Sequence, residues 1–167
     1  MLKSFHTLFG NRRKIPDLEV YAFLEGKTVA LKDVPDQIFS KKILGSGIAI
    51  MPSGQVLMAP VDGTVAALMT RTRHSCCIRG EKGLEVLLHI GVNTVEMNGD
   101  GFELLVENGQ RVKAGDPLIA FSLKKIQEAE LPIVSSMIIT EMGAYHHASF
   151  HQGLEVKKGD VIASLFL

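Results

Sequence analysis

Hydrophobic and polar positions alternate most clearly between Glu85 and Ile90, near the middle of the chain. Side chains of a β-strand point alternately to the two faces of a sheet, so this alternation predicts a strand with two different faces. One face would carry Glu85, Leu87 and His89, and the other Val86, Leu88 and Ile90. Gly91 ends the pattern, which places a titratable imidazole at the end of an otherwise apolar strand.

A second histidine, His74, lies in an upstream run that residues 79–83 separate from this strand, and their turn-forming composition predicts a β-hairpin. With Glu81 and Lys82 as a two-residue turn, the register pairs His74 directly with His89 and puts Thr72 on the same face. Opposed strand residues have Cβ atoms about 4.5 to 5.5 Å apart, which brings two imidazoles within reach of one shared atom. A turn one residue longer would send the side chains to opposite faces and separate the rings.

The rest of the chain from Leu18 onward has the spacing of turn residues that is typical of a β protein. Short runs rich in Val, Ile and Leu are separated by Gly, Pro, Asp or Asn roughly every 8 to 12 residues. Helical patterns are confined to three short segments, residues 33–39, 101–108 and 123–130. The sequence therefore predicts an all-β fold decorated with short helical turns.

Two short motifs each occur twice, which indicates a duplicated β unit that closes on itself. Residues 109–116 are echoed by residues 153–160, and residues 22–29 are echoed, with one residue fewer, by residues 59–65. Biotinyl and lipoyl carrier domains combine similar half-motifs. Those domains display a lysine on an exposed turn beside Met or beside acidic residues and Ala, and this sequence has no such turn, so no covalent cofactor is expected.

Composition and charge narrow the class of partner. The 167 residues fit a single domain, and 18 acidic side chains balance 18 basic ones, which gives no reason to expect nucleic acid or an anionic membrane. The adjacent Cys76 and Cys77 would alternate across a strand and are expected to be small apolar residues in a reducing compartment. No run approaches the roughly 20 apolar residues that span a bilayer, and no signal peptide is evident, so a cytoplasmic protein is expected.

Residues 1–17 differ in composition from the rest and are expected to form a flexible arm on a domain of residues 18–167. The arm carries apolar residues at near-helical spacing, followed by a basic run that ends at Lys14. A short amphipathic element that touches a membrane or a partner is the alternative interpretation.

Several blocks of sequence, in one order, resemble the glucose-type enzyme IIA components of the bacterial sugar phosphotransferase system. They are residues 33–36 (DVPD), 43–50 (ILGSGIAI), 59–65 (APVDGTV), 72–74 (TRH) and 87–95 (LLHIGVNTV), within a match over residues 18–167. The resemblance implies an antiparallel β-sandwich of the duplicated type that carries a phosphoryl group. It makes His89 the phosphorylated histidine and His74 the neighbour that hydrogen-bonds the phosphoryl group, while Thr72 and the carbonyl of Gly91 orient the two rings.

The resemblance also implies a relay in which the histidine phosphocarrier protein HPr is the donor and a cysteine on the IIB domain of a sugar permease is the acceptor. A neutral imidazole, with a reference pKa of about 6.5, can both attack and leave at neutral pH, so no metal or other cofactor is required. We expect a docking face formed by Asp36, Ile38, Phe39, Ile43 and Leu44, with Ile38 and Phe39 outside the core. The protein would act as a monomer and meet the membrane only through the permease or the arm.

Some positions depart from the family pattern. Asn93 stands beside the site where the family often has Asp, and Thr70 and one of the two cysteines stand where it has apolar aromatic residues. Arg71 and Arg73 add positive charge beside the active ring. These changes bear on partner affinity and sugar specificity but leave the two histidines in place.

Two alternatives come from other classes of protein. Facing imidazoles at His74 and His89 can bind Zn²⁺, either in a hydrolase on a related scaffold or between this protein and a partner. A zinc hydrolase needs a third ligand, which the cluster His146, His147 and His151 could supply, whereas Asn93 stands where a carboxylate would help. A purely regulatory binding module would use the same surface without phosphorylation of His89.

Overall fold

The computed structural model describes residues 13–167, which form one eight-stranded sheet and two three-stranded sheets, with every paired strand antiparallel. The large sheet contains, in spatial order, β13 (Glu155–Val156), β2 (Gly26–Ala30), β3 (Gly47–Pro52), β11 (Ser135–Glu141), β7 (Glu85–His89), β6 (Ser75–Arg79), β5 (Gly63–Ala66) and β9 (Arg111–Val112). One small sheet contains β1 (Leu18–Tyr21), β14 (Val161–Phe166) and β12 (His147–Phe150). The other contains β4 (Val56–Met58), β10 (Pro117–Phe121) and β8 (Phe102–Leu104).

The helices of the described residues are short. They are η1 (Leu31–Asp33), α1 (Gln37–Ser40), η2 (Glu81–Gly83), η3 (Thr94–Met97) and α2 (Leu123–Glu128). The prediction for residues 123–130 is confirmed by α2, in which the Ser122 side chain accepts a hydrogen bond from the Lys125 N–H and Ile126 is buried. The prediction for residues 33–39 is confirmed in part by α1. The helical prediction for residues 101–108 is wrong, because Phe102 to Leu104 form β8 and pair with β10.

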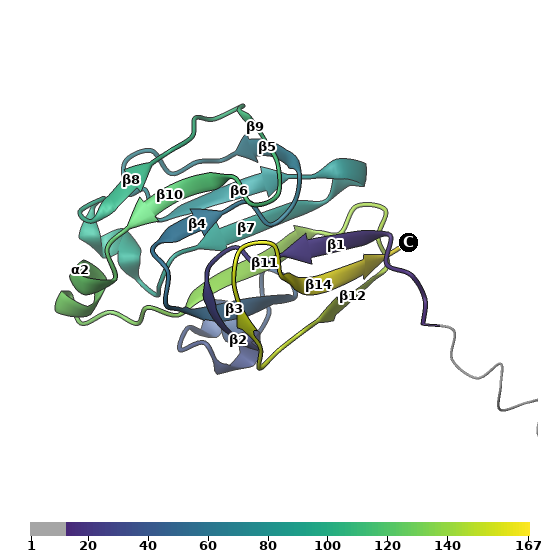
Figure 1. Cartoon of the computed structure of the whole chain (residues 1–167). Coiled ribbons are helices and arrows are strands. Elements are labelled where there is room, and N and C mark those ends of the chain that lie inside the picture. The colour runs from purple at the N-terminus through teal and green to yellow at the C-terminus, as the bar shows by residue number, and fades with distance from the viewer. Residues whose placement is uncertain (1–12) are drawn as a thin grey trace, which may run out of the picture.

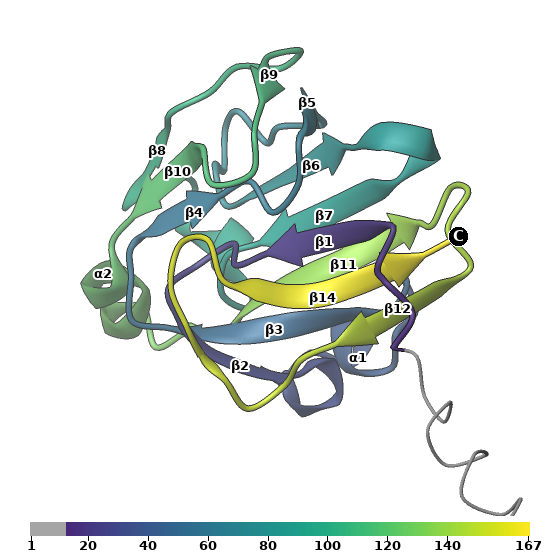
Figure 2. The ribbon, with the colours of Figure 1, turned by 45° about the vertical axis from the view of Figure 1, so that its right-hand side comes forward.

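The two small sheets lie on the same side of the large sheet, so the molecule is a β-sandwich (Figure 1). In the turned view, β14 passes in front of β11 and β3 while α1 lies behind them (Figure 2). The main core fills the space between the layers because alternate residues of each strand point inward. In β7, for example, Val86 and Leu88 belong to this core and are fully buried, whereas Glu85, Leu87 and His89 lie on the other face.

A second, smaller apolar cluster covers that other face of the large sheet. It consists of Leu31, Val34, Phe39, Ala49, Val92, Val134 and Ile138, with Val29 and Leu87 packed against it. Ala49 and Ile138 alternate along β3 and β11 with residues of the main core, which fixes the cluster on the outer face. The segment from η1 through α1 is therefore held against the face that carries His89.

The repeated motifs occupy equivalent places, which confirms the duplicated β unit. Val156 pairs with Gly26, and Val112 pairs with Gly63, so each late motif pairs with the matching early one. The loops after β9 and β13 also agree in detail. In each, the aspartate at the end of the motif accepts a hydrogen bond from the backbone N–H three residues earlier, at 2.8 Å for Asp116 and 2.9 Å for Asp160.

The predicted arm of residues 1–17 falls mostly on residues 1–12, which lie outside the described residues. Its last residues run beside the end of β14. The Asp17 N–H donates to the Leu165 carbonyl at 2.9 Å, and the Lys14 ammonium donates to the Leu167 carbonyl at 3.1 Å. Within residues 13–167, no helix is long and apolar enough to cross a bilayer.

Candidate active site

The two predicted histidines lie side by side on the outer face of the large sheet. The ring centroids of His74 and His89 are 4.8 Å apart, with the ring planes at 82°. His89 ends β7, between β6 on one side and β11 on the other. Its side chain is half-buried, while that of His74 is 5% exposed.

The predicted register of the hairpin is wrong by one residue. The turn is the three-residue η2 segment, in which Lys82 has a φ of 54° and Gly83 a φ of 79°, so Ser75 rather than His74 pairs with His89. The longer turn does not separate the rings as expected. His74 precedes β6 and follows Arg73, whose φ is 58°, so the strict alternation of an extended strand does not apply to it.

The His89 ring is fixed by a backbone carbonyl two residues further along the chain. The His89 Nδ1 lies 2.8 Å from the Gly91 carbonyl oxygen, which can only accept a hydrogen bond, so Nδ1 carries the proton and Nε2 holds the free lone pair. Gly91 is buried with a φ of 65°, and a Cβ at this position would lie 2.6 Å from the Thr94 Cγ2 and 2.9 Å from the Pro132 carbonyl oxygen. Glycine is therefore required at residue 91 for steric and conformational reasons.

Ser135, on the neighbouring strand β11, holds Gly91 in place. Its hydroxyl accepts a hydrogen bond from the Gly91 N–H at 3.0 Å and donates to the Ile133 carbonyl at 3.0 Å. The Thr94 hydroxyl donates to the Ile90 carbonyl on the other side of Gly91. Sequence reasoning missed Ser135 because it lies 44 residues from Gly91 and no local pattern links them.

Thr72 orients the second ring. The Thr72 hydroxyl and the His74 Nδ1 are 2.9 Å apart, and both side chains are buried. If the hydroxyl donates, His74 Nδ1 is the acceptor and its Nε2 carries the proton as a hydrogen-bond donor. The two rings would then present different groups, a lone pair on His89 Nε2 and an N–H donor on His74 Nε2.

Phe39 of α1 packs against the His89 ring. Its ring centroid lies 5.0 Å from that of His89 in an edge-on arrangement, and the side chain is only 6% exposed. The expectation that Phe39 lies outside the core is therefore wrong, because α1 folds it into the second apolar cluster. Asp36 caps this helix, and its Oδ1 accepts hydrogen bonds from the backbone N–H groups of Ile38 at 2.8 Å and Phe39 at 3.4 Å.

Burial keeps both imidazoles neutral. Desolvation, with a smaller contribution from the adjacent His89, lowers the pKa of His74 to about 4. Desolvation also lowers the pKa of His89, although the hydrogen bond to the Gly91 carbonyl and the charge of Asp36 oppose this effect. Near neutral pH the site therefore offers two uncharged rings.

Comparison with known proteins identifies the family. Residues 18–145 match the family model for the phosphoenolpyruvate-dependent sugar phosphotransferase system, EIIA 1. The glucose-specific EIIA component of this system from Staphylococcus epidermidis is 37% identical over 157 residues, which cover 93% of this chain and 94% of that protein. The chain belongs to the EIIA 1 family.

Two further relatives agree with this assignment. The glucose-specific EIIA component from Haemophilus influenzae is 37% identical over 139 residues, 83% of each chain. The solved structure of the glucose permease IIA from Mycoplasma capricolum superimposes with a TM-score of 0.82 at 38% identity, covering 87% of this chain and 94% of that one. The family resemblance and the antiparallel sandwich predicted from the sequence are both confirmed, and this chain is a phosphotransferase-system EIIA component.

Apolar side chains of this EIIA protein stand exposed beside the histidines. Ile38, Ile43 and Leu44, predicted as docking residues, are 50%, 65% and 43% exposed. Sequence reasoning missed Met69 and Val95, each 45% exposed, which line a hollow of about 440 Å³ together with Thr72. Apolar side chains left in water around a reactive group are typical of a surface that binds another protein.

Metal-binding side chains do not converge near the paired rings. Across residues 13–167, no group of three or more His, Cys, Asp or Glu side chains is arranged to hold a metal ion. His147 lies on β12 and His151 directly after it, in a sheet on the far side of the sandwich.

Cys76 is buried and not in a disulfide, and burial raises the pKa of its thiol to about 12.

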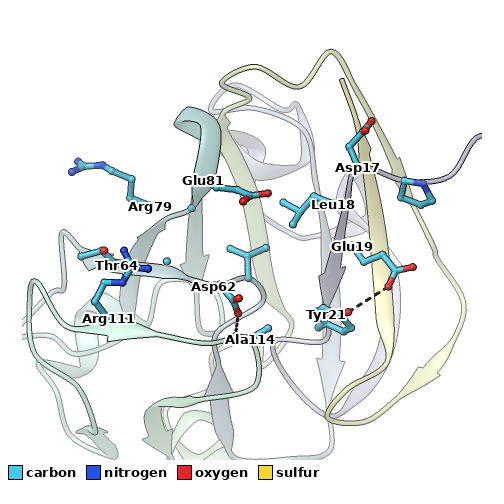
Figure 3. A pocket seen from close by; sticks show the side chains of 14 residues that line it. Asp17, Leu18, Glu19, Tyr21, Asp62, Thr64, Arg79, Glu81, Arg111 and Ala114 are labelled. Atoms are coloured by element: carbon cyan, nitrogen blue, oxygen red, sulfur yellow. Dashed lines mark hydrogen bonds between the residues drawn. The ribbon is translucent and has the colours of Figure 1, made fainter.

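A larger hollow, of about 830 Å³, lies between β1 and the strands β5 and β9 of this EIIA fold (Figure 3). Its charged side chains include Asp17, Glu19, Arg79 and Arg111, and the Asp62 carboxylate in it accepts a hydrogen bond from the Ala114 N–H at 2.8 Å. The hollow contains none of the predicted site residues. The volume of this hollow alone does not indicate a function, so the paired histidines remain the candidate site.

Proposed function

We propose that this protein is a cytoplasmic phosphoryl carrier that accepts a phosphoryl group from phospho-HPr on His89. It then passes the group to a cysteine on the IIB domain of a sugar permease, and it acts as a monomer. One observation carries the proposal: the His89 Nδ1 lies 2.8 Å from the Gly91 carbonyl, which leaves Nε2 as an unprotonated nucleophile beside a second histidine. Membership of the EIIA 1 family supports the same role.

The transfer is a substitution at phosphorus. The lone pair of His89 Nε2 attacks phosphorus, the new N–P bond forms, and the N–P bond of phospho-HPr breaks with its electron pair returning to the donor imidazole. In the second transfer, the cysteine thiolate of the IIB domain attacks, and the electron pair of the breaking bond returns to His89 Nε2. His89 stays ready for another cycle because Nδ1 keeps its proton throughout.

His74 stabilises the transferring group without forming a bond to it. In this proposal the Thr72 hydroxyl, 2.9 Å from His74 Nδ1, donates to that nitrogen. The His74 Nε2–H is then available to the phosphoryl oxygens, which gain negative charge during transfer. The neutral state of His74 suits this role because its lowered pKa keeps one proton on the ring over the physiological range.

The surroundings protect the phosphohistidine and admit the partner. Phe39 covers one side of the His89 ring and limits access of water. The exposed Ile38, Ile43 and Leu44 provide the apolar surface on which HPr and the IIB domain dock in turn. Asp36 contributes indirectly, because its side chain caps the helix that carries Ile38 and Phe39.

Neither alternative function has an observation in its favour. A zinc hydrolase needs a third ligand beside His74 and His89, and the described residues supply none. A purely regulatory module accounts for the docking surface but not for the hydrogen bond to the Gly91 carbonyl that fixes a definite tautomer on His89.

The test is incubation with phosphoenolpyruvate, enzyme I and HPr, followed by detection of acid-labile, base-stable phosphate on the protein. Wild type and the exposed-histidine control His146→Gln should both be phosphorylated. His89→Gln should accept none, because no nucleophilic nitrogen remains. His74→Gln should accept phosphate but pass it on about 10² to 10³ times more slowly, as expected for loss of one transition-state hydrogen bond. Phosphorylation of His89→Gln alongside failure of His74→Gln would invert the assignment, and normal behaviour of both would refute the site.

A further inference from the structure

Ser136 is a buried hydroxyl that lies directly beside the proposed nucleophile. It sits on β11 opposite His89 on β7, and directly opposed residues of two paired strands share a face of the sheet. Its side chain is 0% exposed. Among residues 13–167, the Ser136 Oγ is the one buried side-chain oxygen or nitrogen that finds no hydrogen-bond partner.

The adjacent serine shows how a structural hydroxyl is used in this strand. Ser135 points to the opposite face, donates to the Ile133 carbonyl and accepts from the Gly91 N–H. Both of its hydrogen-bonding functions are therefore satisfied within the fold. Ser136 is flanked on its own face by Ala49 of β3 and by His89, so the folded chain gives its hydroxyl nothing to bind.

An unpaired buried hydroxyl is unfavourable, and alanine would fit an apolar surface better. A hydroxyl at this position is favourable if it gains a hydrogen-bond partner in one functional state of the protein. Phosphorylation of His89 adds three strong acceptor oxygens to a ring that lies in register with Ser136. His74 and Ser136 stand on opposite sides of His89, on the β6 and β11 sides of the ring, so both donors could bind different oxygens of one group.

We propose that Ser136 is a further phosphoryl-binding residue, whose hydroxyl donates to a phosphoryl oxygen when His89 is phosphorylated. The inference rests on the proposed function and adds a second donor to the phosphorylated state. Because Ser136 is unpaired before transfer and paired after it, the hydroxyl favours the phosphorylated protein selectively. His74 differs in that one of its ring nitrogens, Nδ1, already contacts the Thr72 hydroxyl in the unphosphorylated form.

The test measures the equilibrium of phosphoryl exchange with phospho-HPr, together with the thermal midpoint of the phosphorylated and unphosphorylated protein. Three variants are compared with wild type: Ser136→Ala, Ser136→Cys and Ser164→Ala. The cysteine keeps the shape of the side chain, with a slightly larger sulfur in place of oxygen, but is a weak donor. Ser164 is a buried serine of β14, in a small sheet on the far side of the sandwich, and serves as the control.

Ser136→Ala and Ser136→Cys should each shift the exchange equilibrium about tenfold toward phospho-HPr, as expected for loss of a hydrogen bond to a charged group. Their unphosphorylated midpoints should match or exceed that of wild type, while their stabilisation on phosphorylation should be smaller. Ser164→Ala should leave the equilibrium unchanged.

An equilibrium unchanged in both Ser136 variants would overturn the inference while leaving phosphorylation of His89 intact. Equal loss of stability in the two phosphorylation states would also overturn it, because that result describes an ordinary packing role. A wild-type protein that accepts no phosphate on His89 would refute the proposed function itself, and this inference with it.

Discussion

Acidification should destabilise this protein through His74, and the size of the effect follows from its burial. The pKa of His74 is about 4 in the fold and about 6.5 when the ring is exposed. Between these values the unfolded chain binds a proton that the folded protein does not. The stabilisation is therefore complete above pH 6.5 and is lost as the pH falls toward 4. At about 1.4 kcal/mol per pH unit, this loss amounts to roughly 3 kcal/mol of unfolding free energy.

The assay is urea unfolding at several values between pH 7 and pH 4, with wild type, His74→Gln and His146→Gln. Wild type and the exposed His146→Gln control should lose stability in parallel as the pH falls. His74→Gln should lose roughly 3 kcal/mol less unfolding free energy than wild type over the same range. The pH dependence that remains in this variant reflects His89, whose pKa is also lowered in the fold. If His74→Gln followed the wild-type curve, the argument that His74 is held neutral by burial would be refuted.

Three further predictions concern the residues that hold His89 in place. Gly91→Ala should lower the unfolding free energy by at least about 1 to 2 kcal/mol because residue 91 has a positive φ. It should also slow phosphoryl transfer about 10- to 100-fold, because the carbonyl that accepts from His89 Nδ1 moves. A normal transfer rate would contradict the role of this carbonyl in fixing the tautomer. Phe39→Ala should lower the unfolding free energy by about 3 to 5 kcal/mol in chemical denaturation, and a loss below 1 kcal/mol would contradict its burial. Ser135→Ala should slow phosphoryl transfer from phospho-HPr about 10-fold, while His89 remains the acceptor. An unchanged rate would show that Gly91 does not need the Ser135 hydrogen bond to keep its position.

The sequence predicted the parts of the fold that follow from local periodicity and repetition. Alternation along β7 placed His89 on one face and Val86 and Leu88 in the core, and the repeated motifs predicted the paired early and late strands. The helical prediction for residues 101–108 failed because a short apolar run fits either period. Pairing of Phe102 with Phe121 decides in favour of a strand, and that contact is invisible in a local window.

The candidate site was predicted for a partly wrong reason. The two histidines are adjacent, but Lys82 and Gly83 lengthen the turn, and the positive φ of Arg73 compensates by placing His74 outside the regular strand. Neither backbone conformation can be read from hydrophobic pattern. Phe39 was misassigned for a related reason, because packing of α1 onto the sheet is a tertiary contact that the local sequence does not reveal.

The most direct test of the account is nuclear magnetic resonance of the protein labelled with ¹⁵N in histidine, recorded after phosphorylation by enzyme I and HPr. Phosphorus should couple to Nε2 of His89, and the Nδ1 proton of the same ring should persist in slow exchange because it donates to the Gly91 carbonyl. Phosphorus on His89 Nδ1, or on His74, would contradict the assignment of the nucleophile and of the tautomer that the fold imposes on it.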